Sequence, residues 1–255
     1  MTVLEKFRLD GKAVLVTGAS RGLGRAMAIA LAEAGANVAL VSRDKKSLAE
    51  TAAAIEKLGR KAPVIPCDVS KVPEIERACA DAQKALGDIE ILVNNAGIGI
   101  VKPMEKVTPE EWNEVINVNL SSYFFFCQKL LPGWKKLGRG KVINIASIDG
   151  IIAEKQLTAY CASKGGVIQL TKSLALEWSP LKINVNALAP GYFLTDINRK
   201  QFEDPKLGPA MLARIPLRRW GEPEELGPLA VYMASPASDF MTGETVVIDG
   251  GQVIK

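Results

Sequence analysis

The fold of this chain is indicated by its first apolar run and the turn that follows it, Ala13-Val14-Leu15-Val16-Thr17-Gly18-Ala19-Ser20-Arg21-Gly22-Leu23-Gly24. Residues 13–17 form an almost continuous apolar run, which is typical of a parallel strand covered on both faces. The glycines at 18, 22 and 24 allow a tight turn and a close approach of the backbone to a ligand. A helix beginning at this turn presents free amides and the positive end of its dipole to a phosphate. The strand–turn–helix context therefore predicts a nucleotide site.

Six more strand-like runs follow along the 255 residues, with helical stretches such as 25–34 and 48–58 between them. The predicted strands are residues 13–17, 37–41, 62–67, 89–93, 141–146, 182–187 and 245–248. This alternation predicts an α/β fold, a doubly wound parallel sheet with helices on both faces. Thr108-Pro109-Glu110-Glu111 predicts a capped helix start, and Gly35 and Gly59 predict helix ends.

Composition indicates one ordinary globular domain, at 48% hydrophobic and 24% charged residues. We expect residues 1–255 to be a single dinucleotide-binding and catalytic domain, since no linker, repeat or low-complexity tract divides the chain. The poorly periodic segment 191–221 is expected to be a substrate lid, because loops of that length inside compact domains are usually functional.

Several functions are excluded by what the sequence lacks. There is no histidine, so no imidazole can act as base or metal ligand. The net charge of +4 comes without a basic stripe interleaved with aromatics, so no nucleic-acid partner is expected. The four cysteines have no metal-like spacing, so no metal site is expected and the thiols are predicted to be reduced. With no signal-like or membrane-spanning apolar run, we expect a cytoplasmic protein with no membrane partner.

Chemically distinctive residues follow six of the predicted strands, just past their carboxyl ends. They are Gly18, Ser42 with Arg43, Asp68, Asn94-Asn95-Ala96-Gly97, Ser147, and Pro190-Gly191. In open α/β sheets ligands bind along this edge, so these residues are expected to converge on one site.

The end of the second strand bears on which cofactor is bound. A carboxylate usually stands there when the ligand carries a ribose 2′-hydroxyl, but this chain has Ser42 followed by Arg43, and Arg21 lies across the turn. Guanidinium groups bind a 2′-phosphate that a carboxylate would repel, which favours NADP(H) over NAD(H). The alternative is that Arg43 only pairs with Asp44 or faces solvent.

Tyr160 and Lys164 are four residues apart and share one face of a predicted helix. A free phenol titrates near pH ~10, and a neighbouring ammonium would lower that pKa enough for general acid–base chemistry. Ser147 could hydrogen-bond a substrate carbonyl, and Asn119 could hold a water or kink the helix that begins at Thr108. Each of these residues taken alone is more simply read as structural.

Together these residues resemble the short-chain dehydrogenase/reductase family, over about residues 9–251. The motifs are T-G-x-x-x-G-x-G at 17–24, Asp68, N-N-A-G at 94–97, Asn119, Ser147, Y-x-x-x-K at 160–164 and P-G at 190–191. The resemblance implies a seven-stranded parallel sheet in the order 3-2-1-4-5-6-7 and a homotetramer with contacts through residues 110–130 and 155–177.

The resemblance also implies roles for the site residues. Tyr160 would be the proton donor or acceptor, Lys164 would hold the nicotinamide ribose, Ser147 would orient the carbonyl, and Asn119 would support a relay water. Asp68 would meet the adenine, Asn95 the adenine ribose region and Thr195 the carboxamide. The predicted cofactor-binding residues are Gly18, Ser20, Arg21, Gly22, Leu23, Gly24, Ser42, Arg43, Asp68, Val69, Asn95, Ala96, Gly97, Tyr160, Lys164, Pro190, Gly191 and Thr195. The predicted substrate residues are Ser147, Asp149, Tyr160 and Tyr192.

The function expected from this resemblance is NADP(H)-dependent interconversion of a secondary alcohol and a ketone. The segments 189–195 and 219–223 look similar to enzymes of sugar acids and polyols, so a small polyhydroxy or keto substrate ranks first. Reduction of 3-oxoacyl groups on an acyl carrier protein is the alternative, for which residues 135–139 could supply a basic patch. A non-catalytic NADP(H) sensor is a remote third reading, since all the proton-transfer residues are present.

Overall fold

The fold is one parallel sheet between two layers of helices. The computed structural model describes residues 1–195 and 198–254. Its strands are β1 (Ala13–Thr17), β2 (Asn37–Ser42), β3 (Val64–Pro66), β4 (Ile91–Asn94), β5 (Gly140–Ile145), β6 (Ile183–Pro190) and β7 (Thr245–Ile248). They are all parallel, in the order β3-β2-β1-β4-β5-β6-β7. This confirms the predicted fold and strand order.

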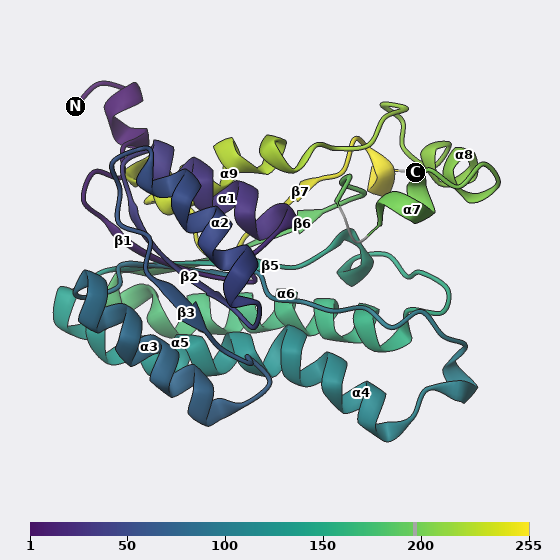
Figure 1. The fold of residues 1–255 in the computed structure, drawn as a ribbon, viewed down its shortest axis with the longest axis horizontal. Helices are drawn as coiled ribbons and strands as arrows, with labels where there is room; N and C mark the ends of the chain where they lie inside the picture. The colour runs from purple at the N-terminus through teal and green to yellow at the C-terminus, as the bar shows by residue number, and fades with distance from the viewer. Residues whose placement is uncertain (196–197, 255) are drawn as a thin grey trace.

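Helices cover both faces of the sheet, as Figure 1 shows. On one face lie α1 (Gly22–Glu33), α2 (Lys45–Glu56) and α9 (Gly227–Ala234). On the other lie α3 (Val72–Leu86), α4 (Pro109–Ile116), α5 (Ser122–Leu137) and α6 (Thr158–Trp178). Two short helices, α7 (Arg199–Phe202) and α8 (Leu207–Leu212), lie at one end of the molecule beside the C-terminal segment. Parallel strands need such crossover helices, which is why both faces are covered.

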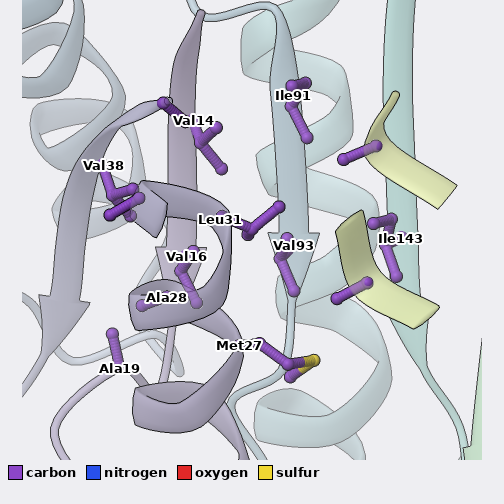
Figure 2. Close-up of a cluster of buried hydrophobic side chains, with 14 of the residues drawn as sticks. Val14, Val16, Ala19, Met27, Ala28, Leu31, Val38, Ile91, Val93 and Ile143 are labelled. Carbon is purple, nitrogen blue, oxygen red and sulfur yellow. The ribbon is translucent and has the colours of Figure 1, made fainter. Parts of the chain in front are cut away.

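The central strand β1 is buried on both sides, as its apolar run predicts. Val14 and Val16 pack with Met27 and Leu31 of α1 (Figure 2), whereas Leu15 packs in the opposite layer. All five side chains are at most 1% exposed. Full burial of each large apolar side chain stabilises the fold by roughly 1.5–3 kcal/mol, so the β1–α1 unit is a rigid base for the turn between them.

The helix-boundary predictions are confirmed. Thr108 and Glu111 form a reciprocal capping box at the start of α4. Gly35 and Gly59 follow α1 and α2 with φ of +114° and +73°, values that glycine adopts without steric cost. The 191–221 segment is not the plain loop that its weak periodicity suggested, since it contains α7 and α8. Its residues 196–197 lie outside the described part of the chain.

Strand β6 is longer than the apolar run that predicts it. It continues to Pro190 because residues 187–190 pair with β7, whose sequence lies more than fifty residues further along the chain. The last strand residue is a proline, and the next amide, of Gly191, donates to the Ile248 carbonyl at 2.9 Å. The chain therefore leaves the sheet at Pro190-Gly191, beside the other strand ends.

Candidate functional site

A cavity of about 650 Å³ opens at the carboxyl ends of the strands. Its walls bring together every predicted site residue except Asn94 and Asn119. The predicted residues on its walls are Gly18, Ser20, Arg21, Gly22, Leu23, Gly24, Ser42, Arg43, Asp68, Val69, Asn95, Ala96, Gly97, Ser147, Asp149, Tyr160, Lys164, Pro190, Gly191, Tyr192 and Thr195. Volumes of roughly 300–1,000 Å³ are usual for cofactor and substrate sites. The convergence follows from the topology, because all seven parallel strands end at this edge.

Hydrogen bonds of Asn95, which we call the Asn95 clasp, hold the glycine turn against the end of β4. The Asn95 side-chain amide donates to the Thr17 carbonyl at 2.9 Å and to the Gly18 carbonyl at 3.2 Å. In return the Thr17 hydroxyl accepts from the backbone amide of Asn95 at 2.9 Å. A Cβ on Gly24 would collide with the Gly18 carbonyl oxygen and the Asn95 amide nitrogen. Glycine at 24 is therefore required by this clasp, and the clasp positions the turn.

The end of β2 offers hydroxyl and guanidinium groups to the cavity. The Ser42 hydroxyl donates to the Ser20 hydroxyl at 3.1 Å, which ties the strand end to the glycine turn. Arg21 and Arg43 are exposed beside them. The neighbouring acid, Asp44, is instead the N-cap of α2 and accepts from the Lys46 and Ser47 amides. Among the described residues no Arg43–Asp44 ion pair forms, so the alternative reading of Arg43 as a partner of that carboxylate loses its support.

Ser147 and Tyr160 face the cavity from β5 and α6. Ser147 has extended backbone just past β5, and its hydroxyl accepts from the Asp149 amide at 3.1 Å. Burial raises the pKa of the Tyr160 phenol to about 12, while the Ser147 hydroxyl acts in the opposite direction. The sequence predicted a pKa below the ordinary value. In the protein alone the phenol is instead a firmly protonated acid at neutral pH.

Lys164 is a buried cation, 3% exposed. Its Nζ donates to the Ile145 carbonyl at 2.7 Å and to the Tyr123 hydroxyl at 3.4 Å. It also lies 5.4 Å from the ring centroid of Tyr123 and 5.7 Å from that of Tyr160. Burial lowers the pKa of Lys164 to about 7, because the low-dielectric surroundings disfavour the charged amine. Without cofactor, the Lys164 amine is therefore only partly protonated at neutral pH.

Asn119 lies one layer behind the cavity wall and is fully buried. It sits in a π-helical turn, Asn117–Ser121, that joins α4 to α5, as the predicted local distortion requires. Its amide oxygen accepts from the Ile98 amide at 2.8 Å. Its amide nitrogen donates to the Ile98 carbonyl at 2.9 Å and to the Ser163 hydroxyl at 3.0 Å. These contacts join α6 to the segment that follows β4.

A polar cluster surrounds Tyr192, one of the predicted substrate residues, and the sequence indicates only part of it. Tyr192 donates through its hydroxyl to Glu154 Oε2 at 3.2 Å, and Arg214 forms an ion pair with the same carboxylate. The Arg214 guanidinium lies 5.6 Å from the Tyr192 ring centroid. Burial and the charge of Glu154 raise the pKa of Asp149 to about 6, with Arg214 opposing them. Arg214 was missed because its neighbourhood in sequence reads as a solvated basic face.

Ile148, Phe193 and Asn198 also line the cavity, and they lie in the two segments, 147–154 and 192–217, that the sequence indicates as substrate walls. Further cavity residues carry no sequence signal that would mark them: Cys67, Ile98, Gly99, Val101, Val118, Ile145, Ala146 and Leu157. Most are apolar, so nothing in the letters separates them from ordinary core residues. Asn198 is positioned by its own bonds: its amide oxygen accepts from the Thr195 amide at 2.8 Å, and its amide nitrogen donates to the Phe193 carbonyl at 2.7 Å.

The fold and this site define a dinucleotide-type α/β oxidoreductase, and comparison with known proteins agrees. A family model described as enoyl-(acyl carrier protein) reductase matches residues 18–252. The chain is 37% identical over 245 residues to gluconate 5-dehydrogenase of Gluconobacter oxydans, covering 96% of each protein. It is 36% identical over 249 residues to D-threitol dehydrogenase of Mycolicibacterium smegmatis, covering 98% of this chain and 95% of that protein.

A solved structure is similarly close. The crystal structure of a gluconate 5-dehydrogenase from Burkholderia cenocepacia, in complex with NADP and tartrate, superposes with a TM-score of 0.94 at 37% identity over the whole of both chains. The chain belongs to the short-chain dehydrogenase/reductase family, as the motifs indicated. Within the described residues, no helix is both long and apolar enough to cross a membrane.

Proposed function

We propose that this protein is an NADP(H)-dependent oxidoreductase that interconverts a secondary alcohol and a ketone on a small polyhydroxy substrate, a sugar acid or a polyol. The observation that carries the proposal is that Ser147, Tyr160 and Lys164 share one cavity with the glycine turn. A phenol, a buried amine and a hydroxyl at a nucleotide-type turn are what carbonyl reduction requires in a chain without histidine.

The residues present fit the cofactor. Gly22 has φ of +53°, a conformation that L side chains rarely adopt, so glycine suits the turn that opens α1. The amides that open α1 would receive the pyrophosphate, and Arg21, Arg43 and Ser42 would receive the 2′-phosphate. When bound, NADP(H) supplies or accepts the hydride. Several relatives support this choice, among them the Burkholderia cenocepacia enzyme solved with NADP.

Tyr160 carries the proton. In reduction the phenol gives its proton to the carbonyl oxygen while the carbonyl carbon receives hydride, and in oxidation the phenolate takes the proton back. With a pKa of about 12 the phenol is protonated at neutral pH in the protein alone, so it holds the proton that reduction consumes. Ser147 orients the carbonyl oxygen by donating its hydroxyl proton. Lys164, with a pKa near 7, can bind and release the replacement proton.

The polar wall supports a hydroxylated substrate over an acyl thioester. Asp149 and Tyr192 line the cavity, and Tyr192 is hydrogen-bonded to Glu154 of the Glu154–Arg214 ion pair. An acyl chain packed here would remove water from these polar and charged groups without offering them hydrogen bonds, which costs free energy. Gluconate 5-dehydrogenase and D-threitol dehydrogenase, to which the chain is similar, are named for a sugar acid and a polyol.

The test is a spectrophotometric screen of gluconate, threitol and an acetoacetyl thioester with NADP(H) and NAD(H), repeated on a Tyr160→Phe variant. We expect the wild-type enzyme to prefer NADP(H) and a hydroxylated substrate. The variant should bind cofactor normally and lose about 10²–10⁴-fold in kcat, the usual contribution of a positioned acid–base group. Near-native turnover by the variant would refute the role of Tyr160, and a preference for the thioester would replace the substrate class.

We further propose that the chain acts as a single-domain, cytoplasmic homotetramer in which segment 191–221 closes over the substrate. Exposed apolar side chains support the assembly, since Phe124 of α5 is 40% exposed, Trp112 of α4 39% and Leu176 of α6 82%. Clustered exposed apolar groups often mark subunit contacts. Light scattering should give four times the chain mass, and Leu176→Lys together with Phe124→Lys should reduce it.

A further inference from the structure

One carboxylate, that of Glu154, joins two separate parts of the chain beside the cavity. Its Oε2 accepts a hydrogen bond from the Tyr192 hydroxyl at 3.2 Å and forms an ion pair with Arg214. In sequence, Glu154 stands between Ser147 and Tyr160, on the loop that joins the two residues proposed to meet the carbonyl. Among the described residues that line the cavity, Tyr192 is present and Glu154 and Arg214 are not. Glu154 therefore reaches the site through the residues that it holds.

The Tyr192 ring packs with side chains from residues 198–221. The rings of Phe202 and Trp220 are stacked, with centroids 4.0 Å apart, and their centroids lie 5.7 and 6.3 Å from that of Tyr192. The Arg214 guanidinium carbon lies 5.6 Å from the same Tyr192 centroid. Aromatic and cation–π contacts of this kind add to the free energy of burial, so these four side chains form one packed unit.

The contact between this unit and Glu154 is charged. Burial acts to raise the pKa of Glu154, but the Arg214 guanidinium and the hydrogen bonds that the carboxylate accepts hold its pKa below the ordinary value. The carboxylate is therefore ionised at neutral pH, and hydrogen bonds to an ionised acceptor are stronger than those between neutral groups. The Glu154 side chain is 23% exposed and that of Arg214 41%, so solvent screens the pair in part. We expect the pair to orient Tyr192 rather than to stabilise the whole fold.

We propose that Glu154 is a positioning residue, which fixes Tyr192 in the cavity wall and couples that wall to the loop that follows Ser147. Without the carboxylate, the Tyr192 hydroxyl loses its acceptor and Arg214 loses its counter-ion. The wall is then free to shift, and substrate binding weakens before the chemical step does. This inference rests on the proposed function, because it takes the substrate to lie against Tyr192. Glu154 itself touches neither substrate nor cofactor and takes no part in proton transfer.

The test measures oxidation of threitol with NADP⁺ by the wild type, Glu154→Ala and Glu203→Ala. The control residue, Glu203, pairs with Arg199 at 3.3 Å, so its removal costs an ion pair of the same segment without affecting Tyr192. We expect Glu154→Ala to raise the KM for threitol about tenfold, the size expected for a lost hydrogen bond to a charged group. The kcat and the Kd for NADPH should stay close to the wild-type values, because only substrate binding is weakened. Glu203→Ala should match the wild type in all three quantities.

A double-mutant cycle shows whether Glu154 acts through the phenol. In a Tyr192→Phe background, Glu154→Ala should raise the KM by less than about threefold, because the hydroxyl that it holds is already absent. A tenfold rise that persists in this background would overturn the role. So would an unchanged KM in the Glu154→Ala single variant.

Hydrogen exchange tests the contact without turnover. In Glu154→Ala the amides of residues 215–221 should exchange about tenfold faster than in the wild type, because local opening becomes easier. In Glu203→Ala they should exchange at the wild-type rate. Equal rates in Glu154→Ala and the wild type would overturn the coupling, whatever the kinetics show. A wild-type enzyme that oxidises neither threitol nor gluconate would instead remove the proposed function, and the exchange rates would still decide whether Glu154 holds this segment.

Discussion

Replacing Asp149 with asparagine should stabilise the cofactor-free protein at neutral pH. In the folded protein the Asp149 pKa is raised from 3.8 to about 6, mainly by burial and also by the charge of Glu154, with Arg214 and Ser147 opposing. The folded state therefore keeps this proton up to about pH 6, whereas the unfolded chain releases it near pH 4. The free energy of unfolding falls between those two values, and the full cost of the buried charge is present above pH 6.

The size of that cost follows from the shift. A difference of about two pKa units corresponds to about 3 kcal/mol, since each unit is worth about 1.4 kcal/mol. Asp149→Asn should therefore raise the free energy of unfolding by about 3 kcal/mol at pH 8 but by only about 1 kcal/mol at pH 4.5.

The measurement is urea unfolding of both proteins without cofactor at the two pH values, compared as a difference so that other titrating groups cancel. Asp81→Asn, an exposed change on α3, serves as the control and should leave the difference flat. A gain from Asp149→Asn that does not change with pH would refute the buried-charge reasoning. So would a loss of stability at pH 8.

Three other changes test the cofactor side of the site. Arg43→Glu should lower the NADP(H) over NAD(H) ratio of kcat/KM by about 10²-fold or more, because it exchanges a charge-assisted bond for a repulsion; an unchanged ratio would remove Arg43 from the 2′-phosphate site. Gly24→Ala should cost about 1–3 kcal/mol in thermal or urea unfolding and weaken NADPH binding, because its Cβ collides with the Asn95 clasp; native stability would contradict the clasp. Tyr123→Phe should lower the Lys164 pKa, because the ammonium loses a hydrogen-bond acceptor 3.4 Å away, and the part of the pH–rate profile that reports Lys164 should move to lower pH. An unchanged profile would show that the Tyr123 hydroxyl does not influence the Lys164 pKa.

Much of the fold was predictable because its signals are local. The β1 run, the glycine turn and the capping box at Thr108 each depend on neighbouring residues, and all three form as their patterns indicate. The residues past the strand ends could be placed at one cavity because parallel strands share an edge. The end of β6 was predicted less well, because its last residues are held in the strand by pairing with β7 rather than by their own composition.

The polar cluster around Tyr192 is the part that local sequence supplied only in part. Glu154 stands near Asp149 in the sequence, but Arg214 lies 60 residues from Glu154 and in its own neighbourhood resembles a solvated basic face. Packing of the 191–221 segment against the C-terminal turn is what brings them around Tyr192. The pKa values of Tyr160, Lys164 and Asp149 have the same origin, because desolvation depends on what surrounds a group in space. Residue order was enough to indicate the enzyme class and to select the residues we propose for proton transfer, whereas burial and long-range contact set the pKa values of those residues and formed the polar cluster around Tyr192.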